Sequence, residues 1–388
     1  MIRVLTILAF AVLATTTFAQ QQAAKLLSRF EHFGHISTIN TLPANGFAVG
    51  DESGEVRTYS IMETPSQWEL SQRWITRAQC VSDVTANPSR TFYMTDGESI
   101  FTGMNPNTFP YHVLETWNGR TLTKIRAERA TAEKDLPATF SPDGSLVLMG
   151  RSQYAVGSNP VTFTKVATTN TYVRSAAYTP DGKVLVIAGT YYVDRDHSKE
   201  WSSSYMNNHH TDDAIEVVMT VDPKTLKPIR QLWSRPYANE RTSIHFPEWR
   251  SFTTHNVDEA AINPEGTEVA VLTNQQTTTV KGHKVTDSRQ GFLTLYTLDG
   301  KVKRQFPFKG EWPEDLRYSP DGKTVWMSYV APEGGQAVIC KMDTRTGKKT
   351  VIDFLGARIN YCAFSEDCRF VATATANSNL VRIWQLPE

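Results

Sequence analysis

Short turns between two apolar runs recur along the chain and set its hydrophobic pattern. In these turns proline presets φ at the first corner, an acidic residue caps the backbone and glycine supplies a positive φ. Alternating apolar residues on both sides of such a turn predict a β-hairpin. The seven turn segments are TLPANGF, ANPSRTF, FSPDGSLVL, YTPDGKVLV, INPEGTEVAV, YSPDGKTVW and FSEDCRFVA, whose last turn residues are Gly46, Arg90, Gly144, Gly182, Gly266, Gly322 and Cys368.

A third apolar run with a recurring aromatic residue follows each hairpin. It is clearest in EVRTYSI, YHVLETWNG, GFLTLYTLDG and LVRIWQL. Self-similarity of this kind, at roughly 40–45 residues per unit, is typical of propeller blades of four strands. The pattern therefore predicts an all-β chain built from seven repeats.

Two segments carry a resemblance to a known family. AVGDESGEVRTYSI and ATATANSNLVRIWQL resemble WD-repeat blades, and the Gly34-His35 pair is similar to the Gly-His dipeptide of that family. The chain also departs from the family pattern, because Ser53 and Ser378 stand where the structural aspartate usually lies. Only Trp117 and Trp384 occupy the tryptophan position. The chain thus resembles a degenerate, secreted, bacterial WD-repeat-like β-propeller family, and the resemblance implies an architecture but transfers no functional residue.

We expect a seven-bladed β-propeller of four-stranded antiparallel blades, forming one domain over residues 20–388. The last repeat stops after its third strand, so its outer strand must come from elsewhere. The segment Lys25 to Phe33 precedes the first inner strand and has the pattern of that missing strand. An N-terminal strand that completes the last blade would close the ring and cover an exposed sheet edge.

The connections divide into two sets that lie on opposite faces of such a ring. When the four strands of a blade are lettered a to d from the inside, the a–b and c–d turns share one face, and all of them are short. The b–c and d–a connections share the other face and hold every long insertion, of which 191–213 and 236–255 should meet in space. The remaining long insertions are 96–110, 151–160 and 274–290.

Long loops in a compact domain are usually functional or disordered, and disordered loops are poor in aromatic residues. The two insertions that should meet are rich in them. We therefore expect a ligand-binding surface here, and the alternative is that the rings only pack the insertions against each other. The candidate binding residues are Tyr191, Tyr192, Trp201, Tyr205, Tyr237 and Trp249.

The same stretch gathers imidazoles and carboxylates that could ligate Zn²⁺ or another divalent ion. His245 and His255 could join them from the neighbouring insertion. The spacing matches no established metal motif, and polar loops collect such residues without binding metal. The candidate ligands are Asp194, Asp196, His197, His209 and His210.

Charge and cysteine content narrow the possible partners. Lysine plus arginine and aspartate plus glutamate number 40 each, so no nucleic-acid partner is expected. Four cysteines in 388 residues are too few for a disulfide scaffold. Their pairing stays open, and for Cys362 a place in the core is the simpler interpretation. The four are Cys80, Cys340, Cys362 and Cys368.

The first residues have the pattern of a secretory signal peptide. A charged start precedes the apolar run Val4 to Leu13, and small residues end at Ala19 before Gln20. We expect residues 1–19 to be removed and the mature chain to be periplasmic or extracellular. The residue directly after the cleavage site is not a cysteine to which a lipid could be attached, so no membrane anchor is expected.

Catalytic signatures such as G-x-S-x-G, H-E-x-x-H and C-x-x-C-H are absent from the chain. The favoured hypothesis is a non-enzymatic scaffold whose long-loop face holds a protein, a peptide or a glycan, with no cofactor. The alternative is a propeller enzyme, such as a lactonase-like hydrolase or a quinone-dependent dehydrogenase, with a metal or cofactor near the central channel. Sites of that kind draw single residues from several blades, so the absence of a linear motif does not exclude them.

Overall fold

The computed structural model describes most of the chain after the first nineteen residues. In the described part, all of the secondary-structure elements are β-strands. No helix there is long and apolar enough to cross a membrane. The described residues are 20–61, 68–76, 78, 80–90, 92–99, 111–122, 124–130, 138–158, 161–192, 214–236, 250–281, 284–308, 311–330, 337–354, 358–375 and 377–387.

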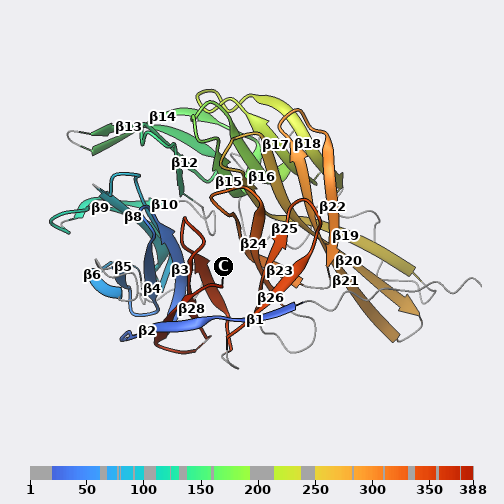
Figure 1. The fold of residues 1–388 in the computed structure, drawn as a ribbon. Coiled ribbons are helices and arrows are strands. Elements are labelled where there is room, and N and C mark those ends of the chain that lie inside the picture. The colour runs from blue at the N-terminus through green and yellow to red at the C-terminus, as the bar shows by residue number, and fades with distance from the viewer. Residues whose placement is uncertain are drawn as a thin grey trace, which may run out of the picture.

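Seven antiparallel sheets stand around a common axis, and each sheet is one blade (Figure 1). The predicted all-β, seven-bladed propeller with four-stranded blades is therefore confirmed. From the innermost strand outward, the blades are β3 (Ile36–Leu42), β4 (Gly46–Asp51), β5 (Glu55–Ile61), β6 (Trp68–Ile75); β7 (Cys80–Ala86), β8 (Phe92–Ser99), β9 (Tyr111–Asn118), β10 (Lys124–Ala130); β11 (Ala138–Phe140), β12 (Leu146–Met149), β13 (Ser152–Ser158), β14 (Val161–Thr168); β15 (Thr171–Tyr178), β16 (Leu185–Tyr192), β17 (Ala214–Val221), β18 (Pro228–Pro236); β19 (Arg250–Ile262), β20 (Glu268–Lys281), β21 (Lys284–Thr297), β22 (Val302–Phe308); β23 (Glu311–Tyr318), β24 (Thr324–Val330), β25 (Ala337–Asp343), β26 (Lys349–Asp353); and β27 (Tyr361–Phe364), β28 (Phe370–Ala374), β29 (Leu380–Gln385), β2 (Lys25–Glu31).

Blade 7 is closed by the N-terminal strand β2. It pairs antiparallel with β29, from Lys25 opposite Gln385 to Glu31 opposite Leu380. The predicted closure by Lys25 to Phe33 is therefore confirmed, although the strand ends two residues earlier. This pairing covers the outer edge of β29, which the C-terminal repeat leaves without a strand.

A further strand, β1 (Gln20–Ala23), was not predicted. It pairs in parallel with β26, so blade 6 has five strands. Ala24 follows it, donates its backbone N–H to the Asp353 carbonyl at 2.9 Å and is buried between blades 6 and 7. The segment before β2 therefore ties these two blades together.

The tight a–b turns are built on a repeated hydrogen-bond pattern. The Ser141 hydroxyl donates to Asp143 Oδ1 at 2.6 Å and accepts the Leu146 N–H at 2.9 Å. Ser319 makes the same two bonds in blade 6. These serines cap the backbone, as the sequence indicates, and are not placed as nucleophiles.

The first turn differs from the expectation. Ala44 and Asn45 adopt positive φ angles of 54° and 58°, whereas Gly46 begins β4. Leu42 pairs with Gly46, so the loop has three residues, Pro43 to Asn45, and the last two of them are left-handed. In blade 4, by comparison, six residues separate the paired Tyr178 and Leu185, so the first turn is the shorter one.

Blade 5 carries a long extension. The insertion 274–290 is a continuation of the β20–β21 hairpin, paired from Asn274 opposite Gly291 to Lys281 opposite Lys284. Residues 250–255, at the end of the insertion 236–255, belong to β19 and pair with the same β20. The resulting three-stranded ribbon projects beyond the ring (Figure 1).

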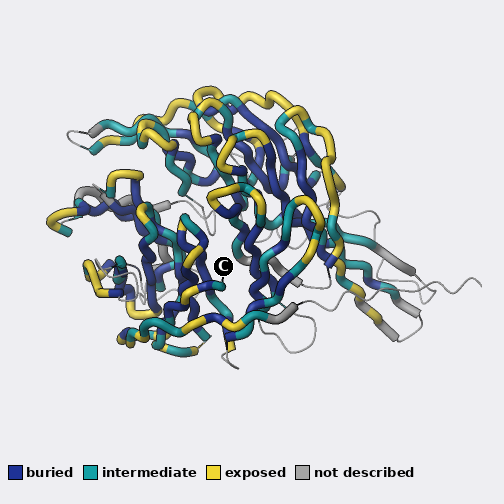
Figure 2. Tube along the Cα trace, in the orientation of Figure 1, coloured by how far each residue is buried: buried dark blue, intermediate teal, exposed yellow. Residues whose placement is uncertain are grey.

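The core lies between neighbouring blades rather than in one central cluster (Figure 2). Between blades 7 and 1, Trp68 stacks on Phe47 at 5.1 Å and meets the edge of Phe370 at 5.4 Å between ring centroids. Burying each such side chain contributes roughly 1.5–3 kcal/mol. No disulfide joins the four cysteines, all of which are described, and Cys362 packs in the core.

Candidate functional site

Most of the candidate binding residues and all of the candidate metal ligands lie outside the described residues. Tyr191 is the second-last residue of β16 and is half-buried against the core of blade 4, and Tyr192 pairs with Ala214 across the b–c hairpin. Pro236, the last described residue before the second insertion, pairs with Ile215. The two insertions thus leave the fold from adjacent strands. The remaining candidates are Trp201, Tyr205, Tyr237, Trp249, Asp194, Asp196, His197, His209 and His210.

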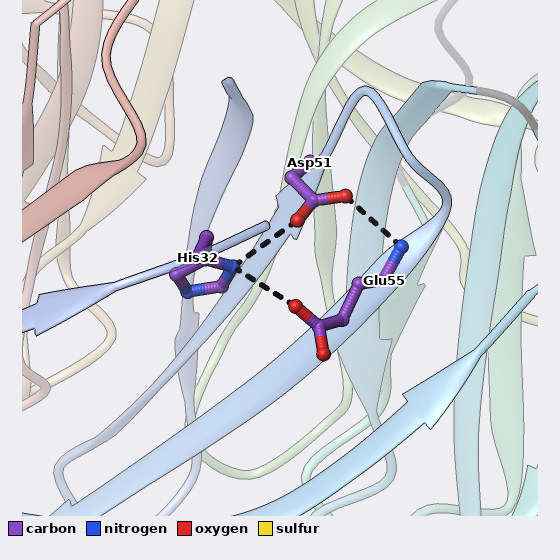
Figure 3. Close-up of side chains that lie close together, drawn as sticks. All are labelled: His32, Asp51 and Glu55. Atoms are coloured by element: carbon purple, nitrogen blue, oxygen red, sulfur yellow. Dashed lines mark hydrogen bonds and ion pairs between the residues drawn. The ribbon is translucent and has the colours of Figure 1, made fainter. Parts of the chain in front are cut away.

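A buried cluster of ionisable side chains lies on the same face, at the start of blade 1 (Figure 3). His32 follows β2, Asp51 ends β4 and Glu55 begins β5, so the cluster joins the d–a connection to the b–c turn. His32 Nδ1 lies 3.5 Å from Asp51 Oδ2 and 4.0 Å from Glu55 Oε2. All three side chains are closed to solvent.

Asp51 acts as the structural aspartate of this turn. Its Oδ1 accepts the N–H groups of Ser53 and Glu55 at 2.8 and 3.0 Å, and its Oδ2 accepts the Gly34 N–H at 3.1 Å. Burial alone would raise the pKa of Asp51, but hydrogen bonds from His32, Ser53 and Gly34 hold it well below its usual range. The resemblance put Ser53 at the position of the structural aspartate, whereas Asp51, two residues earlier, accepts these hydrogen bonds.

The histidine in this network is also not the one that the resemblance indicates. His35 is exposed beside Glu52, while His32 is buried and its Nε2 lies 2.8 Å from the Tyr59 hydroxyl. His32 thus braces the closing strand β2 against blade 1.

The cluster is the only group of at least three potential metal ligands among the described residues, but it does not fit a metal ion. Arg57 Nη2 lies 2.8 Å from Glu55 Oε2, and Arg73 donates to Glu55 Oε1. Both Asp51 oxygens already accept hydrogen bonds. A cation here would face two guanidinium groups and displace existing donors, so we assign the cluster a structural role.

A second polar arrangement lies on the inner strands. In five blades the pairing of the inner strand with its neighbour shifts by one residue, as at a β-bulge. Bulges re-aim side chains and are frequent near functional sites. In each of these blades a polar residue follows the shift, which in blade 6 is the second of two: Thr38, Asp83, Ser175, Glu259 and Asp315.

Four of these residues take part in hydrogen bonds at three junctions between neighbouring blades. The Ser175 hydroxyl donates to Glu259 Oε2 at 2.7 Å, from blade 4 to blade 5. The Phe364 N–H donates to Asp315 Oδ2 at 3.0 Å, from blade 7 to blade 6. Asn40 Nδ2 donates to Asp83 Oδ1 at 2.7 Å, from blade 1 to blade 2. Inner strands have no strand beyond them, and these side chains supply cross-blade hydrogen bonds instead.

The carboxyl groups of this ring are electrostatically unusual. Burial raises the pKa of Glu259 to about 8, and the neighbouring Asp315 and Asp258 act in the same direction. Burial also raises the pKa of Asp258 to about 6 and that of Asp315. Arg317 opposes the shift at both Glu259 and Asp315. Glu259 and Asp315 accept hydrogen bonds from neighbouring blades, and Asp258 accepts one from Asn274 of its own blade, so these carboxyl groups act as structural links.

Sequence reasoning missed this ring, although a signal was present. Asp83, Glu259 and Asp315 each lie four residues before the first residue of their a–b turn, which are Asn87, Asn263 and Ser319. Aligning the repeats on their turns would have placed the three acids at one level.

Comparison with known proteins agrees with the fold. Neither a protein-family model nor a curated protein matches the chain. Among solved structures, the β-propeller domain of Cps50 (Swd1) from Myceliophteria thermophila is 8% identical with a TM-score of 0.56, and the match covers 94% of this chain and 100% of that one. A chain of a mitotic checkpoint complex is 14% identical with a TM-score of 0.57, covering 100% and 99%. At these identities the likeness shows the fold alone, a β-propeller.

Proposed function

We propose that the protein is a binding scaffold that holds a protein partner on the face carrying the b–c and d–a connections. The observation that carries this proposal is the ribbon of blade 5. It comprises residues 250–256, 273–281 and 284–290, which extend three strands beyond the blade.

The ribbon adds little to the core of the propeller. Its described contacts are polar, such as Thr253 Oγ1 to Thr277 Oγ1 at 3.1 Å and Asn256 Nδ2 to Asn274 Oδ1 at 3.3 Å. Ordering such a segment costs conformational entropy that burial of apolar area does not offset. A projecting, ordered and polar element is what a rigid scaffold offers to a partner.

The insertions 191–213 and 236–255 open on the same face, so their aromatic residues would extend this surface. Large, rigid aromatic side chains are the usual anchors of protein interfaces. The similarity to the two solved structures supports the fold only. The support for the binding role comes from the one-sided arrangement of the connections.

We also propose that the protein acts outside the cytoplasm. The support is the pattern of residues 1–19 together with the position of β1, which starts at Gln20, where cleavage is expected. Edman sequencing of the protein from its native host tests this. A first residue other than Gln20 or a near neighbour would contradict the proposal.

Site-specific photo-crosslinking tests the scaffold. A photoreactive residue at Thr277 or Ser288 samples the ribbon, and one at Lys183 or Lys323 samples exposed turns of the opposite face. We expect one crosslinked partner of defined mass from the ribbon positions and none from the turn positions. Equal crosslinking from both faces would overturn the proposal.

A shortened ribbon gives a second measurement with the purified partner. Replacing residues 275–290 with a two-residue Asp-Gly turn keeps the Asn274–Gly291 pair as the new hairpin end. We expect at least tenfold weaker binding with an unchanged melting temperature. Unchanged affinity would contradict a role of the ribbon in binding.

A further inference from the structure

Two arginines face each other where the ring closes. Arg29 of β2 and Arg382 of β29 are register partners in the antiparallel ladder. Their Cα atoms are therefore about 5 Å apart, and both side chains leave the same face of blade 7. Arg29 is exposed and Arg382 is half-buried.

This pairing is unfavourable without a counter-charge. Like charges directly opposite in a ladder destabilise it. Burial lowers the pKa of Arg382, and the charge of Arg29 lowers it further. Over the described parts of the chain, neither guanidinium makes an ion pair, and Glu31, two residues from Arg29, reaches neither of them.

Two other partly buried arginines of the described chain lie against carboxylates. Arg57 lies against Glu55, and Arg174 lies 2.6 Å from Glu216 Oε2. The remaining polar group beside Arg382 is occupied, because the hydroxyl of its other register partner, Thr373, accepts the Trp384 indole N–H at 2.8 Å. The Arg29–Arg382 pair has no such carboxylate among the described residues.

The position suits an extended ligand. β2 is the outermost strand of blade 7, and no described strand pairs with its outer edge. The two arginines lie two residues from the end of β2 and from the start of β29, which is the end of the blade on the long-loop face. An extended peptide could add main-chain hydrogen bonds along this edge while its acidic side chains meet the guanidinium groups.

We propose that Arg29 and Arg382 bind the carboxylates of an acidic peptide segment of the protein partner. The inference rests on the proposed scaffold function and names the chemistry that one part of its binding face recognises. Guanidinium groups bind carboxylates through two parallel hydrogen bonds, and the ligand relieves the repulsion between the two cations.

The test measures binding of a fluorescein-labelled peptide of alternating glutamate and threonine to the full chain by anisotropy, at physiological ionic strength. Arg29→Gln and Arg382→Gln should each weaken binding at least tenfold. Arg369→Gln is the matched control, because Arg369 is exposed on the opposite face and already paired with Asp367. It should change the affinity less than twofold.

Arg29→Glu separates binding from folding. This substitution turns the like-charge pair into a cross-strand ion pair, so the melting temperature should rise while peptide binding is lost. A folded, more stable variant that no longer binds is an outcome that general damage to the blade would not produce.

Three outcomes would overturn the site: no binding of the peptide, an equal loss in Arg369→Gln, or inorganic phosphate competing as well as the peptide at matched ionic strength. The last outcome would assign the pair to free anions. If the ribbon positions crosslink a partner whose affinity Arg29→Gln and Arg382→Gln leave unchanged, the acidic-peptide site falls and the scaffold stands. If no position crosslinks a partner, the scaffold falls.

Discussion

The Ser175 hydroxyl of blade 4 donates to Glu259 Oε2 of blade 5 at 2.7 Å, and Ser175 Oγ accepts the Ala260 N–H at 3.1 Å. One side chain thus joins a carboxyl group and a backbone group of the next inner strand. Because burial disfavours the charged form of the Glu259 carboxyl, its protonation state affects the free energy of unfolding of the protein.

Glu259→Gln should stabilise the protein at neutral pH. A carboxyl group whose pKa is raised from 4.5 to about 8 on folding contributes stability below pH 4.5 that is lost as the pH rises towards 8. The amide keeps a partner for Ser175 and cannot ionise. We expect a gain on the order of 2 kcal/mol at pH 8, reduced by partial solvent access, and none at pH 4.

Urea unfolding between pH 4 and 9 measures this difference. Glu69→Gln, at an exposed carboxyl group of β6, is the matched control and should follow the wild-type curve. A Glu259→Gln curve parallel to the wild type over the whole range would show that Glu259 does not titrate within this window.

Asp51→Asn should have the opposite pH signature. The pKa of Asp51 is depressed in the folded protein, so its contribution is present above pH 3.8 and is lost as the pH falls below that value. The amide also cannot replace the carboxylate as acceptor for Ser53, Glu55 and Gly34. We expect a loss of about 2–3 kcal/mol at pH 7 in urea unfolding. A loss that stays constant down to pH 2 would rule out this origin.

Arg317→Met should destabilise the closure of the ring. Arg317 of blade 6 donates to Thr41 Oγ1 of blade 1 at 3.2 Å, past the inner strand of blade 7, and offsets the charges of Asp315 and Glu259. Removing a cation from a buried group of acids costs about 3 kcal/mol. A double-mutant cycle with Asp315→Asn should recover at least a third of that loss. Strict additivity would mean that the two residues do not interact.

Deleting residues 20–33 should prevent stable folding, whereas deleting residues 20–23 should lower the melting temperature by only a few degrees. The longer deletion removes β2 and leaves β29 with an open edge. The shorter one removes only the fifth strand of blade 6. Thermal melting of both forms makes the comparison, and an unchanged melting temperature for the longer deletion would refute closure by β2.

The sequence predicts the architecture because each blade repeats its own turn. The Ser-Pro-Asp-Gly segments around Ser141 and Ser319 encode both the hairpin and its hydrogen bonds within a few residues. Closure by the segment Lys25 to Phe33 was predictable because the last repeat has only three strands of its own. β1 escaped prediction because its sequence, QQQA, has no alternation and pairs only through its backbone.

The polar ring escaped prediction for a different reason. Side chains of a strand alternate between the two faces of the sheet, and a bulge adds one extra residue to the strand. The residues before and after the bulge therefore no longer fit one alternating pattern of apolar and polar positions. Val81 and Asp83, two positions apart, flank such a shift. The buried His32 was not predicted, because the resemblance to the Gly-His dipeptide indicated His35, which is exposed.

The register of β2 against β29 joins residues some 350 positions apart. The entropic cost of loop closure grows only as the logarithm of this separation, so it lowers the stability little. The separation does constrain the order in which the blades can form during synthesis. β2 is synthesised before the other blades and β29 after them, so blade 7 can close only once β29 has been made. Until then β2 is an unpaired strand, and chaperone binding to the nascent chain should persist until synthesis of β29 is complete.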